Sequence, residues 1–163
     1  MLTGAGGNMV ASAGPDGLLL VDDQFAPLAD RIEAALIALP EPATLSERPL
    51  KYVINTHHHG DHTGGNRHFA GRGAILLARE SARVRLLDAA PTPDTPLPVI
   101  TYSDGIKIYF NGDRLQLLGL AGHTDGDTAV FFEQANASLE ILAKKHLGHN
   151  FNRLKLHYCK LSN

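Results

Sequence analysis

The sequence has no tryptophan and only one cysteine, Cys159. A single cysteine excludes a disulfide within the chain and says little about the redox compartment. Aromatic residues make up 6% of the sequence, which argues against a large aromatic binding face. No apolar run approaches the roughly 18 residues that would span a membrane. The residues after Met1 have neither the charged start nor the apolar stretch of a secretory signal, so the compartment stays open between cytoplasm and periplasm.

Charge of one sign is equally scarce, because 15 Lys and Arg residues stand against 17 Asp and Glu residues and leave a net charge of −2. A nearly neutral chain lacks the basic surface that nucleic acid or anionic lipid would bind. The length of 163 residues and the apolar fraction of 44% are those of one ordinary globular domain. We therefore expect no nucleic acid and no membrane among the partners.

Turn residues and apolar patterns divide the chain into strands and helices in mixed order. Residues 18–21 are a continuous apolar run, and the Gly-Pro-Asp-Gly turn before them predicts a hairpin with residues 8–13. Residues 29–39 carry an amphipathic helical pattern, which prolines at 40 and 42 end. An Asn-Gly pair at 111–112 predicts a second hairpin. The other expected elements are a strand over 52–56, a short helix over 65–69, a strand over 74–78, a helix over 80–87 and strands over 106–110, 115–118 and 128–132.

The last part of the chain differs in character from the rest. It is rich in lysine and arginine, and no acidic residue follows Glu140. Apolar residues between 139 and 147 are spaced as in an amphipathic helix. We therefore divide the chain into a domain of residues 1–136 and a divergent basic tail of residues 137–163. Zinc-binding residue types in this tail match no metal-site spacing, and we interpret them as tail residues; they are His146, His149, His157 and Cys159.

Histidine is abundant: there are nine, and three are consecutive after the strand expected over 52–56. His57 and His59 are two residues apart, so in an extended chain their side chains project to the same side. His58 projects to the other side, and we assign it to substrate contact or to support of the site. Imidazole nitrogens are common zinc ligands. The cluster therefore predicts two ligands of a zinc ion at the end of a buried strand.

Three further residues extend this candidate site. Asp61 and His62 follow in the same turn and can approach a second point near the first. His123 lies in a Gly-His-Thr segment after another strand and is the candidate for a third ligand. Asp61 and His62 have an alternative role as capping residues of the short helix that follows. Asp125 and Asp127 are interpreted as residues that fix a turn.

Taken together, the Thr-His-His-His-Gly-Asp-His segment and the later Gly-His-Thr segment resemble the motifs of the metallo-β-lactamase superfamily. The likeness covers about residues 4–136. It implies an α+β fold, the αββα sandwich of that family, of which this chain holds mainly the N-terminal half as a mixed sheet with flanking helices. The implied activity is zinc-dependent hydrolysis, in which a metal-activated hydroxide attacks an ester, thioester, amide or lactam-type bond of a small-molecule substrate.

The same resemblance implies a role for each residue of the cluster at a pair of zinc ions. Asp61 and His62 would belong to the second ion, and Asp61 would act as the catalytic residue that orients the nucleophile. Asp22, at the end of the strand over 18–21, would accept a hydrogen bond from a ligand histidine and fix its ring. The ligands implied for the first ion are His57, His59 and His123.

The chain departs from the family's pattern after residue 132. The family has a glycine–aspartate pair there whose carboxylate bridges both zinc ions, whereas residues 137–142 contain no aspartate. A last histidine of the family lies in a second half that this chain lacks. We therefore expect one tightly held zinc ion with a second weak or absent, and we interpret the chain as truncated or frame-shifted. The alternative function is a catalytically defective metal-binding fragment.

Half of a sandwich would leave one sheet face without its partner. The apolar strands over 18–21 and 128–132 are then expected to expose their side chains. Such a chain would form a homo-oligomer through the exposed sheet or dissolve poorly.

Overall fold

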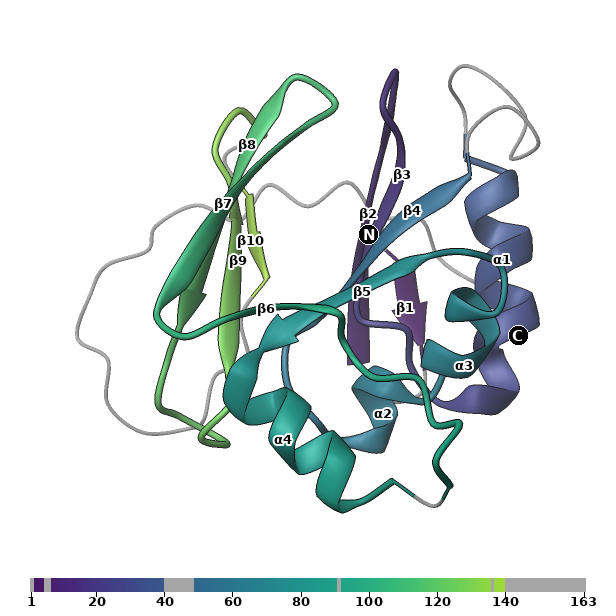
Figure 1. Ribbon diagram of the computed structural model, residues 1–163. Helices are drawn as coiled ribbons and strands as arrows, with labels where there is room; N and C mark the ends of the chain where they lie inside the picture. The colour runs from purple at the N-terminus through teal and green to yellow at the C-terminus, as the bar shows by residue number, and fades with distance from the viewer. Residues whose placement is uncertain (1, 5–6, 40–48, 91, 136, 140–163) are drawn as a thin grey trace.

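The computed structural model describes residues 2–4, 7–39, 49–90, 92–135 and 137–139. Two β-sheets pack face to face, and helices cover the outer face of one of them (Figure 1). The six-stranded sheet has the order β1 (Leu2–Gly4), β2 (Gly7–Gly14), β3 (Gly17–Val21), β4 (Leu50–Asn55), β5 (Ile75–Arg79) and β6 (Ile100–Tyr102). The four-stranded sheet has the order β10 (Ala137–Leu139), β9 (Thr128–Phe132), β8 (Asp113–Gly119) and β7 (Gly105–Phe110).

The parallel part of the six-stranded sheet brings the ends of several strands to one edge. β3, β4, β5 and β6 are parallel neighbours, while β1 and β2 join in antiparallel fashion. Parallel neighbours need crossover connections, and helices supply them here. The helices are η1 (Ala26–Leu28) and α1 (Ala29–Ile37) after β3, α2 (Gly60–Thr63) and α3 (Asn66–Ala70) after β4, and α4 (Glu80–Asp88) after β5. The carboxyl ends of β3 and β4 therefore lie side by side.

Both predicted hairpins are present. β2 and β3 pair antiparallel up to Gly14 and Gly17, which flank the turn. β7 and β8 are joined at Asn111 and Gly112, whose φ angles are 54° and 75°. Positive φ at both central residues is the backbone that Asn-Gly turns adopt in two-residue hairpins, which is why this pair is informative in a sequence.

Two apolar layers hold the sheets and helices together. The first lies between the six-stranded sheet and the helices, and it contains Ile32 of α1, Phe69 of α3 and Leu20 of β3. The second lies between the two sheets, and it contains Ile54 of β4 and Leu117 of β8. The six-stranded sheet is thus covered on both faces, which explains the continuous apolar run of β3.

The expected exposure of apolar strands is wrong for the strands that were named. Every residue of 18–21 is at most 4% exposed, since helices cover one side of this strand and the second sheet covers the other. In 128–132, Val130 and Phe132 are buried in the layer between the sheets. The exposed apolar side chains of the four-stranded sheet lie elsewhere, as at Tyr109, which is 73% exposed. Association of copies through a sheet stays a prediction.

The other predicted elements lie close to observed ones, and short elements were missed. The predicted helices and strands correspond to α1, α3, α4, β4, β5 and β7 to β9. The strands β1, β6 and β10 and the single-turn helix α2 were not predicted. β10 uses the first three residues of the segment predicted as a tail. Apart from Leu139 in this strand, the helix predicted over 139–147 lies outside the described residues.

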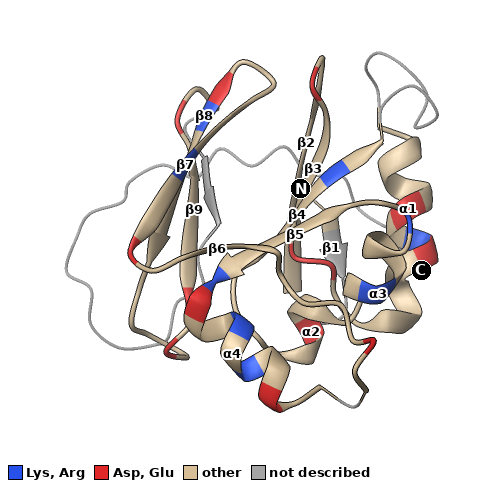
Figure 2. Cartoon of the chain, viewed as in Figure 1, with Lys and Arg blue, Asp and Glu red and all other residues tan. Residues whose placement is uncertain are grey.

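Charged residues lie mainly on the helices, in turns and near strand ends (Figure 2). α4 carries residues of both signs (Figure 2). Among the described helices, none has the length and apolarity needed to cross a membrane.

Candidate metal centre

The first part of the site is a network of buried polar groups where β3 and β4 end. Asp22 directly follows β3, is 1% exposed and has a φ of 61°, a left-handed conformation that aspartate tolerates better than most residues. Its Oδ1 accepts a hydrogen bond from the backbone N–H of Thr56 at 2.8 Å, and its Oδ2 accepts one from the Thr56 hydroxyl at 2.7 Å. Thr56 directly precedes His57, so the carboxylate of Asp22 fixes the start of the histidine loop.

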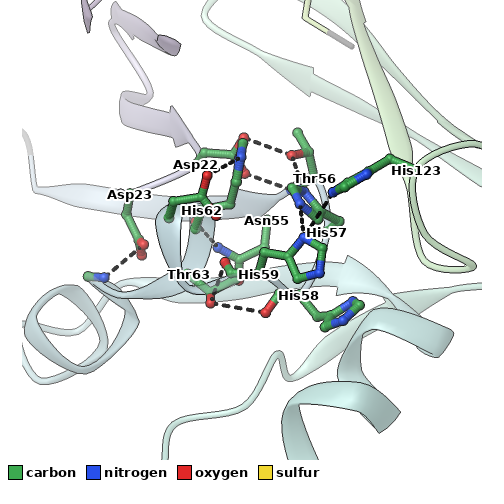
Figure 3. Close-up of polar contacts among 12 residues, drawn as sticks. Asp22, Asp23, Asn55, Thr56, His57, His58, His59, His62, Thr63 and His123 are labelled. Atoms are coloured by element: carbon green, nitrogen blue, oxygen red, sulfur yellow. Dashed lines mark hydrogen bonds and ion pairs between the residues drawn. The ribbon is translucent and has the colours of Figure 1, made fainter. Parts of the chain in front are cut away.

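Three histidines converge beyond this network (Figure 3). The Nδ1 atom of His59 lies 3.0 Å from Nε2 of His57 and also 3.0 Å from Nε2 of His123. One ring nitrogen of each histidine lies within 4.8 Å of the other two. His57 and His59 follow β4 of the six-stranded sheet, whereas His123 lies between β8 and β9 of the other sheet. Two loops from different sheets therefore present nitrogen atoms to one point.

Asp61 and His62 lie in α2, beside this point. The Nδ1–H group of His62 donates to Oδ2 of Asp22 at 2.8 Å, and Nε2 of His62 lies 3.4 Å from Oδ2 of Asp61. The ring centroids of His57 and His62 are 4.1 Å apart. The alternative role as helix caps is wrong, because α3 has no side-chain cap hydrogen bond. Instead, Oδ2 of Asp61 and Nε2 of His62 form a pair of possible metal-ligand atoms next to the three histidines.

His58 lies outside this group. Its ring points away from the three converging nitrogen atoms (Figure 3). Its Nδ1 atom is buried and has no hydrogen-bond partner among the described residues. Burial and the neighbouring His59 lower the pKa of His58, while Asp125 acts in the opposite direction. A role of His58 in substrate contact stays a prediction.

The loop that carries His123 is fixed by a carboxylate of its own. Asp127 is 2% exposed and accepts hydrogen bonds from the backbone N–H groups of His123 and Thr124 and from the Thr124 hydroxyl. The next residue, Thr128, donates its backbone N–H to the carbonyl of Thr56 at 2.8 Å. Asp127 is thereby confirmed as a residue that fixes this turn, and the Thr128 bond joins the turn to the end of β4.

The electrostatic environment keeps His57 neutral and gathers negative charge around His62. Burial, together with the neighbouring His62 and His59, lowers the pKa of His57 to about 3. A neutral imidazole has the lone pair that metal binding requires. Burial alone would lower the pKa of His62, but its hydrogen bond with Asp22 and the charges of Asp22 and Asp61 raise it above the ordinary value. Negative charge at this position favours a bound cation.

The donor set of the three histidines fits a zinc ion. Two nitrogen ligands at about 2.0–2.1 Å from a tetrahedral zinc ion lie about 3.3 Å from each other. The two separations of 3.0 Å from Nδ1 of His59 are close to that value. A single N–H group cannot lie between three ring nitrogens at once, whereas one cation can accept all three lone pairs. Nδ1 of His57 lies 3.5 Å from the Thr56 hydroxyl, which gives the ring its outer neighbour.

Several polar residues that support the site were not predicted from the sequence. Asn55, the last residue of β4, donates to the carbonyl of His62 at 3.3 Å and accepts from the side chain of Asn66 at 3.0 Å. Asp23 is 0% exposed and accepts from the backbone N–H of Gly65 at 2.9 Å. The available signal was the Asp-Asp pair directly after a buried strand, where carboxylates need hydrogen-bond donors nearby.

A second group of metal-binding residue types joins α1 to α3. Oε2 of Glu33 lies 3.0 Å from Nε2 of His68, and Oδ1 of Asp30 lies 3.5 Å from Nδ1 of the same ring. Arg72 forms an ion pair of 2.9 Å with Oε1 of Glu33, and its Nη1 atom lies 3.2 Å from Nδ1 of His68. A guanidinium already supplies positive charge here, so we interpret the group as an ion-pair network between two helices.

The sequence profile of the metallo-β-lactamase superfamily matches residues 4–137, which include both histidine loops. The chain belongs to this superfamily. The family resemblance and the α+β fold predicted from the sequence are thereby confirmed.

Curated relatives of the chain include several hydroxyacylglutathione hydrolases. The protein from Gloeobacter violaceus is 31% identical over 119 residues, which are 71% of this chain and 43% of that protein. The protein from Brucella anthropi is 30% identical over 125 residues, which are 74% of this chain and 44% of that protein. The chain thus spans less than half of the length of these relatives.

Solved structures of the superfamily share the fold. A metallo-β-lactamase from Pontibacter korlensis matches with a TM-score of 0.66 at 17% identity, covering 78% of this chain and 56% of that one. A class B3 di-zinc metallo-β-lactamase from an Alaskan soil metagenome matches with a TM-score of 0.64 at 22% identity, covering 75% of this chain and 49% of that one. At such identities the likeness concerns the fold alone.

Proposed function

We propose that this chain is the zinc-binding part of a hydrolase that cleaves the thioester bond of a small acyl-thiol substrate. The observation that carries the proposal is the convergence of three imidazole nitrogens, with Nδ1 of His59 at 3.0 Å from Nε2 of both His57 and His123. The substrate class rests on the curated relatives, whose name is hydroxyacylglutathione hydrolase. We therefore propose, from these relatives, both that the substrate is a small molecule and that the bond cleaved is a thioester.

The residues around the three histidines suit such a reaction. A zinc ion held by the three histidines would lower the pKa of a bound water molecule to about 7 and so supply hydroxide near neutral pH. Asp61 is 34% exposed, so its carboxylate can meet a substrate or a water molecule from solvent. We assign to Asp61 the task of orienting the nucleophilic water and accepting its proton. Oδ2 of Asp22 lies 2.8 Å from Nδ1 of His62, and this hydrogen bond keeps the other ring nitrogen, Nε2, on the side of Asp61.

One zinc ion is the stoichiometry that the described residues support. Their three-ligand groups are the three histidines and the Asp30, Glu33 and His68 network. Asp61 and His62 belong to neither, so in the described part of the chain a second ion finds two ligands and no third. We therefore propose one tightly held ion, at the three histidines, and weak binding of a second.

A second candidate function follows from this incomplete second position. The chain then binds one zinc ion but turns over no substrate, as a metal-binding fragment of the superfamily. The lack of a third ligand beside Asp61 and His62 among the described residues favours it. Zinc content does not separate the two functions, but turnover does.

The test is to purify the chain without a histidine tag and measure zinc per folded chain by elemental analysis, next to a His57→Ala variant. One zinc ion that the variant loses supports the site. Hydrolysis of a hydroxyacylglutathione, followed as release of free thiol, then separates the hydrolase from the inactive fragment. A folded chain that binds no zinc overturns both candidate functions.

A further inference from the structure

Arg79 is the last residue of β5, and its guanidinium contacts the loop that carries His123. Its Nη1 atom donates to the carbonyl oxygen of Leu120 at 2.7 Å and to that of Asp125 at 3.1 Å. Its Nε atom donates to the carbonyl oxygen of Ser103 at 2.8 Å. Leu120 precedes His123 by three residues and Asp125 follows it by two. One side chain therefore holds the backbone on both sides of the third histidine.

Two glycines let this loop approach so closely. A Cβ atom at Gly119 would lie 2.8 Å from Nε and 2.9 Å from Cζ of Arg79. A Cβ atom at Gly126 would lie 2.8 Å from the backbone nitrogen of Ala82 in α4. Real side chains do not tolerate such distances, so both ends of the loop are seated where only glycine fits without a shift.

Other contacts from α4 reach the same loop. The hydroxyl of Ser81 donates to the carbonyl oxygen of Asp125 at 2.9 Å. The guanidinium of Arg85 pairs with the carboxylate of Asp125 at 2.7 Å. Both partners of this pair are about half exposed, so it contributes little on its own. In Figure 1 the start of α4 lies beside the loop between β8 and β9, as these contacts require.

The three histidines differ in how much they need such support. His57 is 1% exposed and follows the buried end of β4, whereas His123 is exposed. The distance of 3.0 Å between His123 and His59 therefore depends on where the second loop is held. We propose that Arg79 is a positioning residue that keeps His123 at metal-binding distance, an inference that rests on the zinc site proposed above. Its planar fork of donors suits three carbonyl groups at once, which a lysine ammonium does not match.

The experiment compares the full chain with Arg79→Met, Arg79→Lys and, as the matched control, Arg83→Met. Arg83 lies on α4 and also donates to a backbone carbonyl, that of Pro98 at 3.0 Å, but this carbonyl is outside the His123 loop. Zinc affinity is measured by competition with a chromophoric chelator, and coordination by the visible absorption of the cobalt-substituted protein. Amide hydrogen exchange over residues 119–128 is measured on the metal-free proteins.

We expect Arg79→Met to weaken zinc binding about 10- to 100-fold, the usual range for residues that orient a ligand. The cobalt spectrum should change as it does in a His123→Ala variant, and exchange in the loop should rise. Arg79→Lys should recover part of each effect, and Arg83→Met should cause none. Unchanged exchange in Arg79→Met overturns the inference, and so does zinc affinity equal to that of the unaltered chain.

The two proposals fail in different ways. If the unaltered chain binds no zinc, the proposed function fails, while the exchange measurement still decides whether Arg79 holds the loop. If Arg79→Met does not fold, Arg79→Lys serves instead, because it keeps the positive charge and loses the fork of donors. That variant should raise exchange in the loop and weaken zinc binding, and an unchanged loop or an unchanged zinc affinity then overturns the inference.

Discussion

The two loops that present the histidines are built in opposite ways. The loop after β4 begins in the core, where Asp22, Thr56 and His57 are each at most 1% exposed. Side-chain hydrogen bonds connect Asp22 to Thr56 and to His62. The loop between β8 and β9 exposes His123, and groups outside the histidine cluster hold its backbone. The first loop is fixed by a buried polar network, and the second by the carboxylate of Asp127 within it together with donors from Arg79 and α4.

This difference has a physical consequence for metal binding. A ligand on a buried strand end costs little to order at the moment of binding, because folding has already fixed it. A ligand on an exposed loop keeps its position only while each contact to its backbone persists. We therefore expect changes in the first loop to damage folding, and changes in the second to damage metal affinity more than stability.

The substitution with the largest expected effect on stability is Asp22→Ala, which tests the buried network of the first loop. The change leaves the N–H and hydroxyl groups of Thr56 and the Nδ1–H group of His62 without their acceptor in a buried place. It also forces alanine to adopt a φ of 61°. Each unsatisfied buried donor costs about 1–3 kcal/mol, so we expect the free energy of unfolding to fall by about 3–5 kcal/mol. Urea denaturation measures it.

A conservative variant and a surface control are measured beside Asp22→Ala. Asp22→Asn keeps tolerance of the left-handed backbone and one acceptor oxygen, so its loss should be smaller. Asp88→Ala, at an exposed position at the end of α4, should leave the free energy of unfolding within about 0.5 kcal/mol of its original value. An Asp22→Ala chain as stable as the Asp88→Ala chain contradicts the role given to the buried network.

How far the sequence predicts this architecture depends on whether a signal is local. The hairpin turn at Asn111 and Gly112 was predictable, because positive φ at both residues selects these residue types. The three-residue strands β1, β6 and β10 were not, because partner strands decide such short pairings. The pairing of the two sheets escaped prediction for the same reason: it depends on contacts between β3 or β4 and the distant strands β8 and β9.

The residues of the candidate site also differ in whether a local sequence signal marks them. Consecutive histidines after an apolar strand are a local signal, and they indicated His57 and His59 directly. The role of Arg79 leaves no such signal, because its acceptors are backbone carbonyls 24, 41 and 46 residues away. Any residue type offers a carbonyl group, so no pattern in the sequence marks these partners. The resemblance to the superfamily joined His123 to the first cluster, which spacing alone left open.

The second prediction concerns the exposed loop and has a smaller effect on stability. Asp127→Ala removes the acceptor of the backbone N–H groups of His123 and Thr124 and of the Thr124 hydroxyl. We expect the free energy of unfolding to fall by about 1–2 kcal/mol, because water can reach part of this loop. Zinc affinity should fall about 10- to 100-fold, since His123 is no longer held. Chelator competition and urea denaturation measure the two quantities.

The control for this prediction lies in the first loop. In Asp127→Ala, amide exchange at residues 53–57 should stay as slow as in the unaltered chain, because the contacts of Thr56 with Asp22 remain. Equal acceleration in both loops would mean that they open as one unit. The comparison between a loop fixed in the core and an exposed loop that moves independently of it would then be wrong.

The last prediction is a gain of stability, at Asp23. Burial raises the pKa of its carboxyl group well above the ordinary value, and its Oδ2 atom has no hydrogen-bond partner among the described residues. A raised pKa in the folded state means that stability is greatest below the unfolded pKa of about 3.9 and is lost as pH rises through the folded pKa. Asp23→Asn keeps an acceptor for the Gly65 N–H group and removes this loss.

At pH 7.5 we therefore expect the metal-free Asp23→Asn chain to be more stable than the unaltered chain, because burial raises the pKa of the Asp23 carboxyl group. At pH 4 the two should be nearly equal, since the aspartate is then protonated in the folded chain. Urea denaturation in the presence of a chelator measures both, because bound metal would add a pH dependence of its own. Asp94→Asn, at an exposed position, serves as the control. A variant that is less stable at pH 7.5 would show that Asp23 is ionised in the folded chain, and that the buried network after β3 needs its charge.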